Sequence, residues 1–222
     1  MERGPEPSTP SSRRYDGSRR QAEARARRLR VIDAATSLFL AHGFGDTSIQ
    51  RIAEEAGVSV QTVYAVFGSK AGILHAAIDV AVGGDDEEVL LRDQPENAWV
   101  AEERDPRTWV RAMAHVIRLT HERSAAVIHL LESVAGTEET LAELVETMTT
   151  ARREDSRFAV TIGPLDPAAV GLTADEAGDL IAMIAAVWGW VELVMRGGWA
   201  PDRYEDWLGD LLERELVGPR PT

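Results

Sequence analysis

Apolar residues recur along most of the chain at the spacing of an α-helix, and the alternation typical of β-strands is rare. In the segment 20–41, for example, Ile32, Ala35 and Phe39 fall on one helical face. Gly43 follows them and can adopt the left-handed conformation that ends many helices. The pattern predicts an all-α fold that opens on an amphipathic helix over 20–41.

Two short helices are predicted directly after the first. Thr47 and Gln50 have the spacing of a capping box, in which each side chain bonds the other residue's backbone amide. That helix should end near Gly57, and Ser59 can cap the start of the next helix, which runs to about Phe67. A tight glycine turn therefore joins the two short helices.

Further helices are predicted beyond Lys70, which lies near the first turn of a fourth helix. The stretch GGDDEEVLLRDQPEN, residues 83–97, has the composition of an acidic connection rather than of a regular element. After it, apolar stripes at helical spacing predict three more helices, over 106–122, 124–135 and 138–158.

The last two helices are the best specified. Thr173 and Glu176 have capping-box spacing and open a long apolar helix over 173–196, and Pro201 opens another over 202–216. Two neighbouring apolar stripes are more than the surface of a small domain carries, so we expect a homodimer through these segments. The uncharged run Leu180–Val191 is shorter than the roughly 20 residues that cross a bilayer, so we expect a buried helix and no membrane anchor.

Charge divides the chain into unlike parts. The 222 residues carry a net charge of -13, yet residues 1–80 hold 11 Lys and Arg against 9 Asp and Glu. Nine arginines lie in the first 30 residues, where they either attract phosphate or form a solvated tail without a specific role. We expect a disordered basic tail over 1–20, a small helical domain over 21–68 and a larger helical domain over 69–222.

Composition excludes several classes of site. The chain has no cysteine, so it has neither a disulfide scaffold nor a thiolate zinc site. His115, His121 and His129 lack metal-ligand spacing, and no Ser-His-Asp arrangement or phosphate loop is present. The N-terminus lacks the apolar core of a signal peptide. We expect no metal, no cofactor and no enzymatic activity, and a cytoplasmic location.

The two short helices and their glycine turn have the residues that a helix-turn-helix requires. Such a unit needs a small residue where its helices cross, a turn residue that tolerates positive φ, and an apolar residue that pins the second helix. Ala53, Gly57 and Val63 meet these three needs. Small or polar side chains that could reach base edges then face outward from the second helix: Val60, Gln61, Thr62 and Ala65.

The flanking residues carry a more specific signal. The pattern T-S-x-x-R-I-A-x-x-A-G-V-S-x-x-T-x-Y-x-x-F-x-S-K-x-x-I-L, from Thr47 to Leu74, closely resembles the DNA-binding signature of the TetR family of transcriptional regulators. The resemblance covers about residues 28–78. It implies a dimer that binds double-stranded DNA at a palindromic operator and, in most members, a repressor that a small molecule releases.

The resemblance also assigns roles to single residues. Matching positions in the family contact bases or phosphates, with Tyr64 and Lys70 on phosphate, and the candidate DNA-binding residues are Thr47, Ser48, Gln50, Ser59, Val60, Gln61, Thr62, Tyr64, Ala65 and Lys70. One position departs from the pattern: two residues after Tyr64 the family often has Tyr or His, whereas Val66 can only pack. One phosphate contact is therefore missing, and the arginine-rich tail is a candidate to replace it.

A ligand-binding role is implied for the C-terminal part. Six side chains are candidates to line a pocket for a largely apolar or aromatic effector: Trp109, Met113, Thr120, His129, Met148 and Trp188. Each could equally be an ordinary core or interface residue, and His129 could pair with Glu132. The rival to a regulator is an all-α protein-interaction module with a vestigial DNA-binding head, which would bind no DNA even at low salt.

Overall fold

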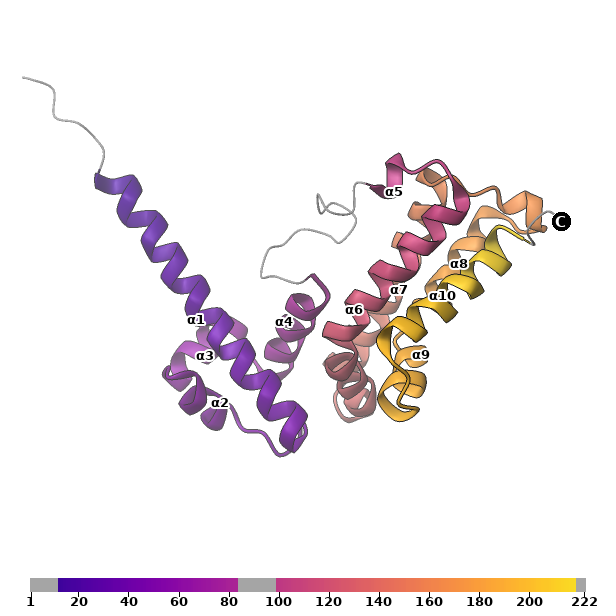
Figure 1. Cartoon of the computed structure of the whole chain (residues 1–222). Coiled ribbons are helices and arrows are strands. Elements are labelled where there is room, and N and C mark those ends of the chain that lie inside the picture. Colours follow the sequence, from indigo (N-terminus) through magenta and orange to yellow (C-terminus); the bar gives the residue numbers. More distant parts are fainter. Residues whose placement is uncertain (1–11, 84–98, 219–222) are drawn as a thin grey trace, which may run out of the picture.

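The computed structural model describes residues 12–83 and 99–218, and within these two ranges every regular element is helical, which confirms the all-α prediction. The first four helices form a head at one end of the molecule (Figure 1). They are α1 (Ser12–His42), α2 (Ile49–Ala56), α3 (Val60–Phe67) and α4 (Lys70–Gly83).

The remaining helices lie side by side as a second body at the other end of the molecule (Figure 1). They are α5 (Trp99–Glu102), α6 (Pro106–Val134), the 3₁₀ turn η3 (Ala135–Thr137), α7 (Glu139–Ile162), the 3₁₀ turn η4 (Pro167–Val170), α8 (Ala174–Ile184), α9 (Trp188–Trp190), the π-helical segment η5 (Val191–Arg196) and α10 (Pro201–Leu216).

Helix α1 is longer than predicted. It begins at Ser12, so the disordered tail expected over 1–20 is wrong for residues 12–20, and residues 1–11 lie outside the described ranges. Alanine and arginine, both good helix formers, dominate residues 19–30. Arg19 and Glu23 also form an i,i+4 ion pair of 3.0 Å. The acidic connection expected over 83–97 falls outside the described residues except for Gly83, which ends α4.

Helix α6 is one continuous element, whereas two helices were predicted over 106–122 and 124–135. Neither glycine nor proline occurs between Pro106 and Val134 to end the first of them. The hydroxyl of Ser124 donates to the carbonyl of Thr120 at 2.7 Å, within the helix, so a polar residue at the expected break does not interrupt it.

The opposite correction applies to the apolar helix predicted over 173–196. Its capping box at Thr173 is confirmed, but α8 ends at Ile184. Side chains of two other helices take carbonyls that a continuous helix would use: Arg152 Nε donates to Ala182 O at 3.1 Å, and His121 Nε2 bonds Ala185 O at 3.0 Å. Groups inserted into the i→i−4 ladder are a recognised cause of helix breaks.

Two hydrophobic cores hold the fold together. The first core fills the head and continues into the C-terminal body through Val127 and Leu131 of α6 and Leu141 and Leu144 of α7. The second core lies within the C-terminal body and includes fully buried Trp109, Tyr204, Leu208 and Leu212. Because α4 contributes to the first core, the head packs directly on α6 and α7.

One segment, Ala174–Arg196, is long and apolar enough to cross a membrane by length and composition alone. The bent pair α3 and α4 passes the same test only when its two helices, 67° apart, are taken together. About a third of the most apolar stretch of Ala174–Arg196 is buried in the fold, 33%. The helix also breaks at Ala185, so we read its exposed apolar side as a protein interface.

Candidate nucleic-acid interface

The turn between α2 and α3 has the predicted helix-turn-helix geometry. Gly57 has φ 65° and ψ 39°, in the left-handed region that favours glycine. The amide of Val58 donates to Ala53 O at 3.0 Å and closes the end of α2. Ser59 caps α3 by accepting from the Thr62 amide at 3.1 Å, and Val63 is buried against the other helices with 1% of its surface exposed.

Most of the predicted contact residues lie on the surface. Gln61, Ala65 and Tyr64 are exposed on α3, Tyr64 by 52%, while Val60 and Thr62 are half-buried. The hydroxyls of Ser59 and Thr62 bond each other at 2.8 Å, which leaves one of the two hydroxyl protons for another acceptor.

The start of α2 adds a second exposed group of predicted residues. Ser48 and Gln50 are both exposed there. The N-cap is Ser48, whose hydroxyl accepts from the Arg51 amide at 3.2 Å. The capping box predicted from Thr47 and Gln50 is therefore wrong. Thr47 is 1% exposed, and its hydroxyl donates to Gly43 O at 2.8 Å. Thr47 therefore holds the loop between α1 and α2 from inside.

Lys70 begins α4, near its predicted position, but its ammonium group bonds the protein's own backbone. Its Nζ donates to the carbonyls of Phe44 at 2.6 Å, Thr47 at 3.1 Å and Gly45 at 3.3 Å, and lies 4.4 Å from the centre of the Phe44 ring. An ammonium group has three donors, so these carbonyls use all of them. In this structure Lys70 ties the loop before α2 to the start of α4 and has no donor left for phosphate.

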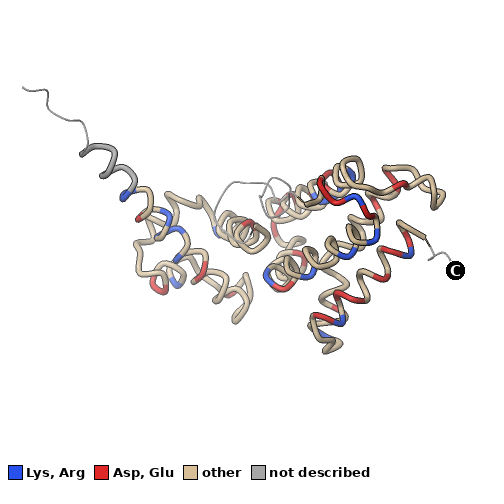
Figure 2. The backbone as a smooth tube through the Cα atoms, turned by 45° about the horizontal axis from the view of Figure 1, so that its top comes forward, with Lys and Arg blue, Asp and Glu red and all other residues tan. Residues whose placement is uncertain are grey.

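Charge is arranged as a DNA-binding head would require. Arginine recurs along α1, whereas aspartate and glutamate are spread over the C-terminal helices (Figure 2). Residues 81–222 hold 13 Lys and Arg against 28 Asp and Glu. The acidic part therefore stands apart from the recognition helix, where it can discourage non-specific attachment without opposing docking.

The candidate ligand residues do not converge on one pocket. Trp109 is fully buried, donates from Nε1 to Val100 O at 3.0 Å and packs edge-on to Trp99. Gly163 lies against it so closely that an added Cβ would sit 2.9 Å from the Trp109 ring. Trp188, in contrast, is 56% exposed. The first tryptophan is a core residue and the second lies on an outer face.

The other four candidates are half-buried, and the two methionines among them pack against different cores. Met113 packs against the second core, and Met148 packs against the first. Thr120 accepts the Ser124 hydroxyl through its carbonyl. No hydrogen bond or ion pair between His129 and Glu132 is found in the described residues; burial raises the pKa of the Glu132 carboxyl, and the nearby His129 opposes this rise.

A buried polar cluster joins α6, α8 and α10. Because a carbonyl only accepts, the bond to Ala185 O places the proton of His121 on Nε2, and Nδ1 then accepts from Tyr204 Oη at 3.2 Å. Burial lowers the pKa of His121 from 6.5 to about 4, the bond to Ala185 opposes this, and nearby Arg152 adds to it. Burial raises the pKa of Tyr204. The imidazole is therefore a neutral structural group.

A second polar cluster lies between α6 and α7. The Oε2 atom of Glu132 is buried and has no hydrogen-bond partner, and burial raises the pKa of this carboxyl, while His129 and Arg152 lower it. Burial lowers the pKa of Arg152, whose Nε donates to Ala182 O. Sequence reasoning considered Glu132 only as a partner of His129 and missed Arg152, because the approach of Arg152 to Glu132 depends on how α6 and α7 pack.

The predicted dimer stripes divide into an inner and an outer set. Leu208 and Leu212, expected on the dimer interface, are fully buried in the second core. The outer set is Met183, Trp188 and Met195, which are 64%, 56% and 48% exposed. The apolar stripe of α10 therefore faces its own domain, and the exposed apolar side chains of segment 174–196 make the outer face.

Comparison with known proteins agrees with this geometry. The profile of the family described as bacterial regulatory proteins, tetR family, matches residues 31–77, which contain the helix-turn-helix. An uncharacterized HTH-type transcriptional regulator of Pseudomonas putida, TtgW, is 42% identical over 57 residues, which is 26% of this chain and 42% of the relative. The matches to curated relatives span between 27% and 42% of those proteins.

Solved structures extend the likeness to the whole fold. NalD of Pseudomonas aeruginosa, the secondary repressor of the MexAB-OprM multidrug efflux pump, is 23% identical with a TM-score of 0.61, over 86% of this chain and 96% of that one. A transcriptional regulator of Saccharomonospora viridis in complex with choline is 19% identical with a TM-score of 0.62, over 85% and 96%. At these identities the likeness concerns the fold. The family profile therefore identifies residues 31–77 as similar to the DNA-binding region of the tetR family of bacterial regulatory proteins, and the whole chain has the fold of solved structures described as TetR-family regulators.

Proposed function

We propose that the chain is a transcriptional repressor that binds a palindromic operator as a homodimer and is released by a small molecule. The observation that carries the proposal is the α2–Gly57–α3 unit, which buries Ala53 and Val63 and leaves Gln61 and Tyr64 on the surface. A helix of this kind enters the major groove and presents polar side chains to base edges.

Dimerisation is supported by the outer apolar face of segment 174–196. Met183, Trp188 and Met195 expose large apolar side chains that a monomer would leave in water. Trp207 of α10 is 37% exposed and enlarges the exposed apolar surface. We therefore still propose that the dimer pairs through 173–196 and 202–216. A two-fold dimer would place two heads on two half-sites, which is why the operator should be palindromic.

For the effector we propose a site between α6 and α7 instead of the dispersed tryptophans. Glu132 and Arg152 bring charge into this layer, the Glu132 Oε2 atom lacks a partner, and His129 lies nearby. Met148, one turn before Arg152 on α7, offers an apolar wall. These groups suit a largely apolar molecule that carries one hydrogen-bond donor or positive charge. The choline bound by the Saccharomonospora viridis regulator is a ligand of cationic type.

Coupling between effector and DNA has a physical route in the first core. That core runs without interruption from α1 and α4 of the head to Leu131 of α6 and Leu144 of α7. A molecule wedged between α6 and α7 would disturb it and shift the head. A coupling of about 1 to 3 kcal/mol would weaken operator binding roughly 5- to 150-fold, and DNA would weaken effector binding equally. A regulator that acts on bacterial DNA works in the cytoplasm.

Sequence selection from a random DNA pool with the purified full chain tests the function. Recovery of one palindromic site is the expected result. If the chain binds no duplex even at low salt, it is instead an interaction module with a vestigial head.

The effector site is tested with the selected operator and a library of small molecules. Compounds that release the protein should be apolar molecules with a donor or cationic group, and Glu132→Gln should reduce their effect at least tenfold. Glu146→Gln, a change of the same kind at an exposed position on α7, is the matched control and should respond like the wild type. If both variants respond equally to the compounds, the effector does not bind at this site.

A further inference from the structure

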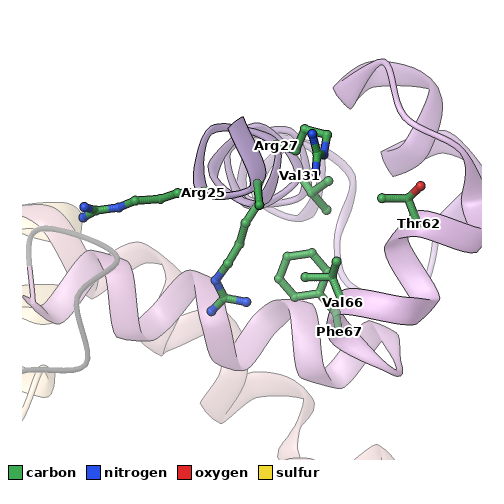
Figure 3. A pocket seen from close by; sticks show the side chains of 8 residues that line it. Arg25, Arg27, Val31, Thr62, Val66 and Phe67 are labelled. Atoms are coloured by element: carbon green, nitrogen blue, oxygen red, sulfur yellow. The ribbon is translucent and has the colours of Figure 1, made fainter. Parts of the chain in front are cut away.

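A hollow of about 450 Å³ separates the N-terminal half of α1 from α3. Arg25, Arg27 and Arg28 line it from α1, and Val66 and Phe67 line it from α3 (Figure 3). None of its lining residues is acidic. Three arginines and no carboxylate along one hollow favour an anion there.

The hollow forms because α1 runs past the core of the head. Val31 and Ala35 are buried on the inner face of α1, and one and two turns earlier the same face carries Arg28 and Ala24. Alanine at position 24 leaves room beside the helix. Arg28 lies over the Phe67 ring, 5.1 Å from its centre, which fixes the position of its side chain.

Arg27 is the arginine best placed to meet an outside anion. It is exposed and lies on the side of α1 that faces Thr62 and Val66, whereas Arg25 reaches away from α3 (Figure 3). The nearest acidic residue in the chain, Glu23, is paired with Arg19 at 3.0 Å. Within the described ranges, no ion pair or hydrogen bond to Arg27 competes with an incoming ligand.

The position of the hollow identifies that anion. Thr62 and Val66, one turn apart on α3, form its other wall, and α3 is the helix that would occupy the major groove. The groove is about 12 Å wide, so a phosphate strand passes on each side of a helix seated in it. The strand on the α1 side would run along the hollow. Val66 is 47% exposed and has no polar atom, so it cannot bind that strand itself.

We propose that the hollow is a binding site for the phosphodiester backbone of DNA beside α3, in which Arg27 and Arg28 supply the contacts that Val66 cannot. The inference rests on the proposed DNA-binding function. Guanidinium groups bind phosphate through paired N–H donors, and such contacts set affinity and register without reading bases. The two arginines therefore raise affinity for all sequences alike.

Arg27→Ala and the double variant Arg27→Ala/Arg28→Ala test the site on the operator and on a shuffled duplex. Each lost phosphate contact should lower affinity for both duplexes roughly fivefold and reduce the salt slope by about 0.9. The preferred sequence should not change. Within the described residues Arg27 makes no hydrogen bond, ion pair or ring contact, so its loss should leave folding intact. Thermal unfolding checks the double variant, which removes the Phe67 stack.

Arg30→Ala is the matched control. Arg30 is exposed on the same helix, bonds its own backbone at Ala26 O and does not line the hollow. Its loss should change affinity less than twofold, and Val66→Arg should restore the salt slope of the double variant. Equal losses for Arg27→Ala and Arg30→Ala would mean that only overall charge matters and would overturn the site, as would an unchanged slope in the double variant. If the wild type binds no duplex, the proposed function fails instead.

Discussion

The head and the C-terminal body of this protein differ in how their structures are determined. In the head, Ser59 and Gly57 act on residues within one helical turn, so their effects are local. In the C-terminal body, α8 ends where side chains from α6 and α7 bond its last carbonyls. These side chains lie 64 positions away in the sequence for α6 and 30 positions away for α7. Local signals therefore shape the DNA-reading unit, and tertiary contacts shape the body proposed to control it.

The largest effect is expected where the inner apolar stripe of α10 is broken. Leu208→Glu would place a carboxylate in the second core at a position that is fully buried, at a cost of about 4 kcal/mol or more. The C-terminal body should unfold in thermal or denaturant melts monitored by circular dichroism. If the variant stays folded and becomes monomeric, Leu208 lies at the dimer interface and not in the core.

The buried imidazole should make stability depend on pH. Because the pKa of His121 is lowered from 6.5 to about 4 on folding, the unfolded chain takes up the proton first as the pH falls. The free energy of unfolding should therefore fall by about 3 kcal/mol between pH 6.5 and 4. His121→Gln can still donate to Ala185 O and accept from Tyr204, and it should lack this part of the pH dependence. Identical pH profiles would exclude His121 as the source.

The outer apolar face should control assembly and leave folding unchanged. In the double variant Met183→Glu/Trp188→Glu, both changes are at exposed positions, so melts should stay within about 0.5 kcal/mol of wild type. Sedimentation should show monomers, and operator affinity should fall on the order of 100-fold because one head no longer raises the local concentration of the other. An intact dimer would place the interface elsewhere.

Variants at two polar residues of the head should affect different quantities: Lys70→Met should lower stability, and Tyr64→Phe should lower DNA affinity. Lys70→Met removes three bonds to carbonyls and should cost about 2 kcal/mol of stability, while the salt slope of the remaining DNA binding stays as in the wild type. Tyr64→Phe, at a position 52% exposed, should leave stability alone and weaken DNA binding. If the salt slope of DNA binding falls by about one unit in Lys70→Met, Lys70 does contact phosphate.

The sequence predicted the head well because its determinants are near neighbours in the chain. Gly57, Ser59 and the pair Ala53 and Val63 all have their predicted roles. The two misplaced residues, Thr47 and Lys70, have polar side chains that could have served the surface or the interior. Only the folded loop between α1 and α2 shows that its carbonyls accept hydrogen bonds from both residues and that the Phe44 ring contacts Lys70.

The C-terminal body was predicted less well for the same physical reason. Periodicity located apolar faces, but a face that packs inside its own domain looks the same in sequence as one that packs on a partner. Leu208 and Trp188 are the clearest instances: Leu208, in a segment expected at the dimer interface, is buried, and Trp188, expected to line a pocket, is exposed. The hollow between α1 and α3 was equally hidden, because it depends on how α1 and α3 lie against each other in the fold.

The specificity of the wild-type head tests the central claim most directly. The dissociation constants of the full chain for the selected palindrome and for a shuffled duplex should be compared at about 0.15 M salt, together with those of Gln61→Ala. We expect the palindrome to bind about 1,000-fold or more tightly, and Gln61→Ala to lose most of this ratio while keeping the salt slope. Equal affinity of the wild type for both duplexes would contradict the account of α3 as a sequence-reading helix.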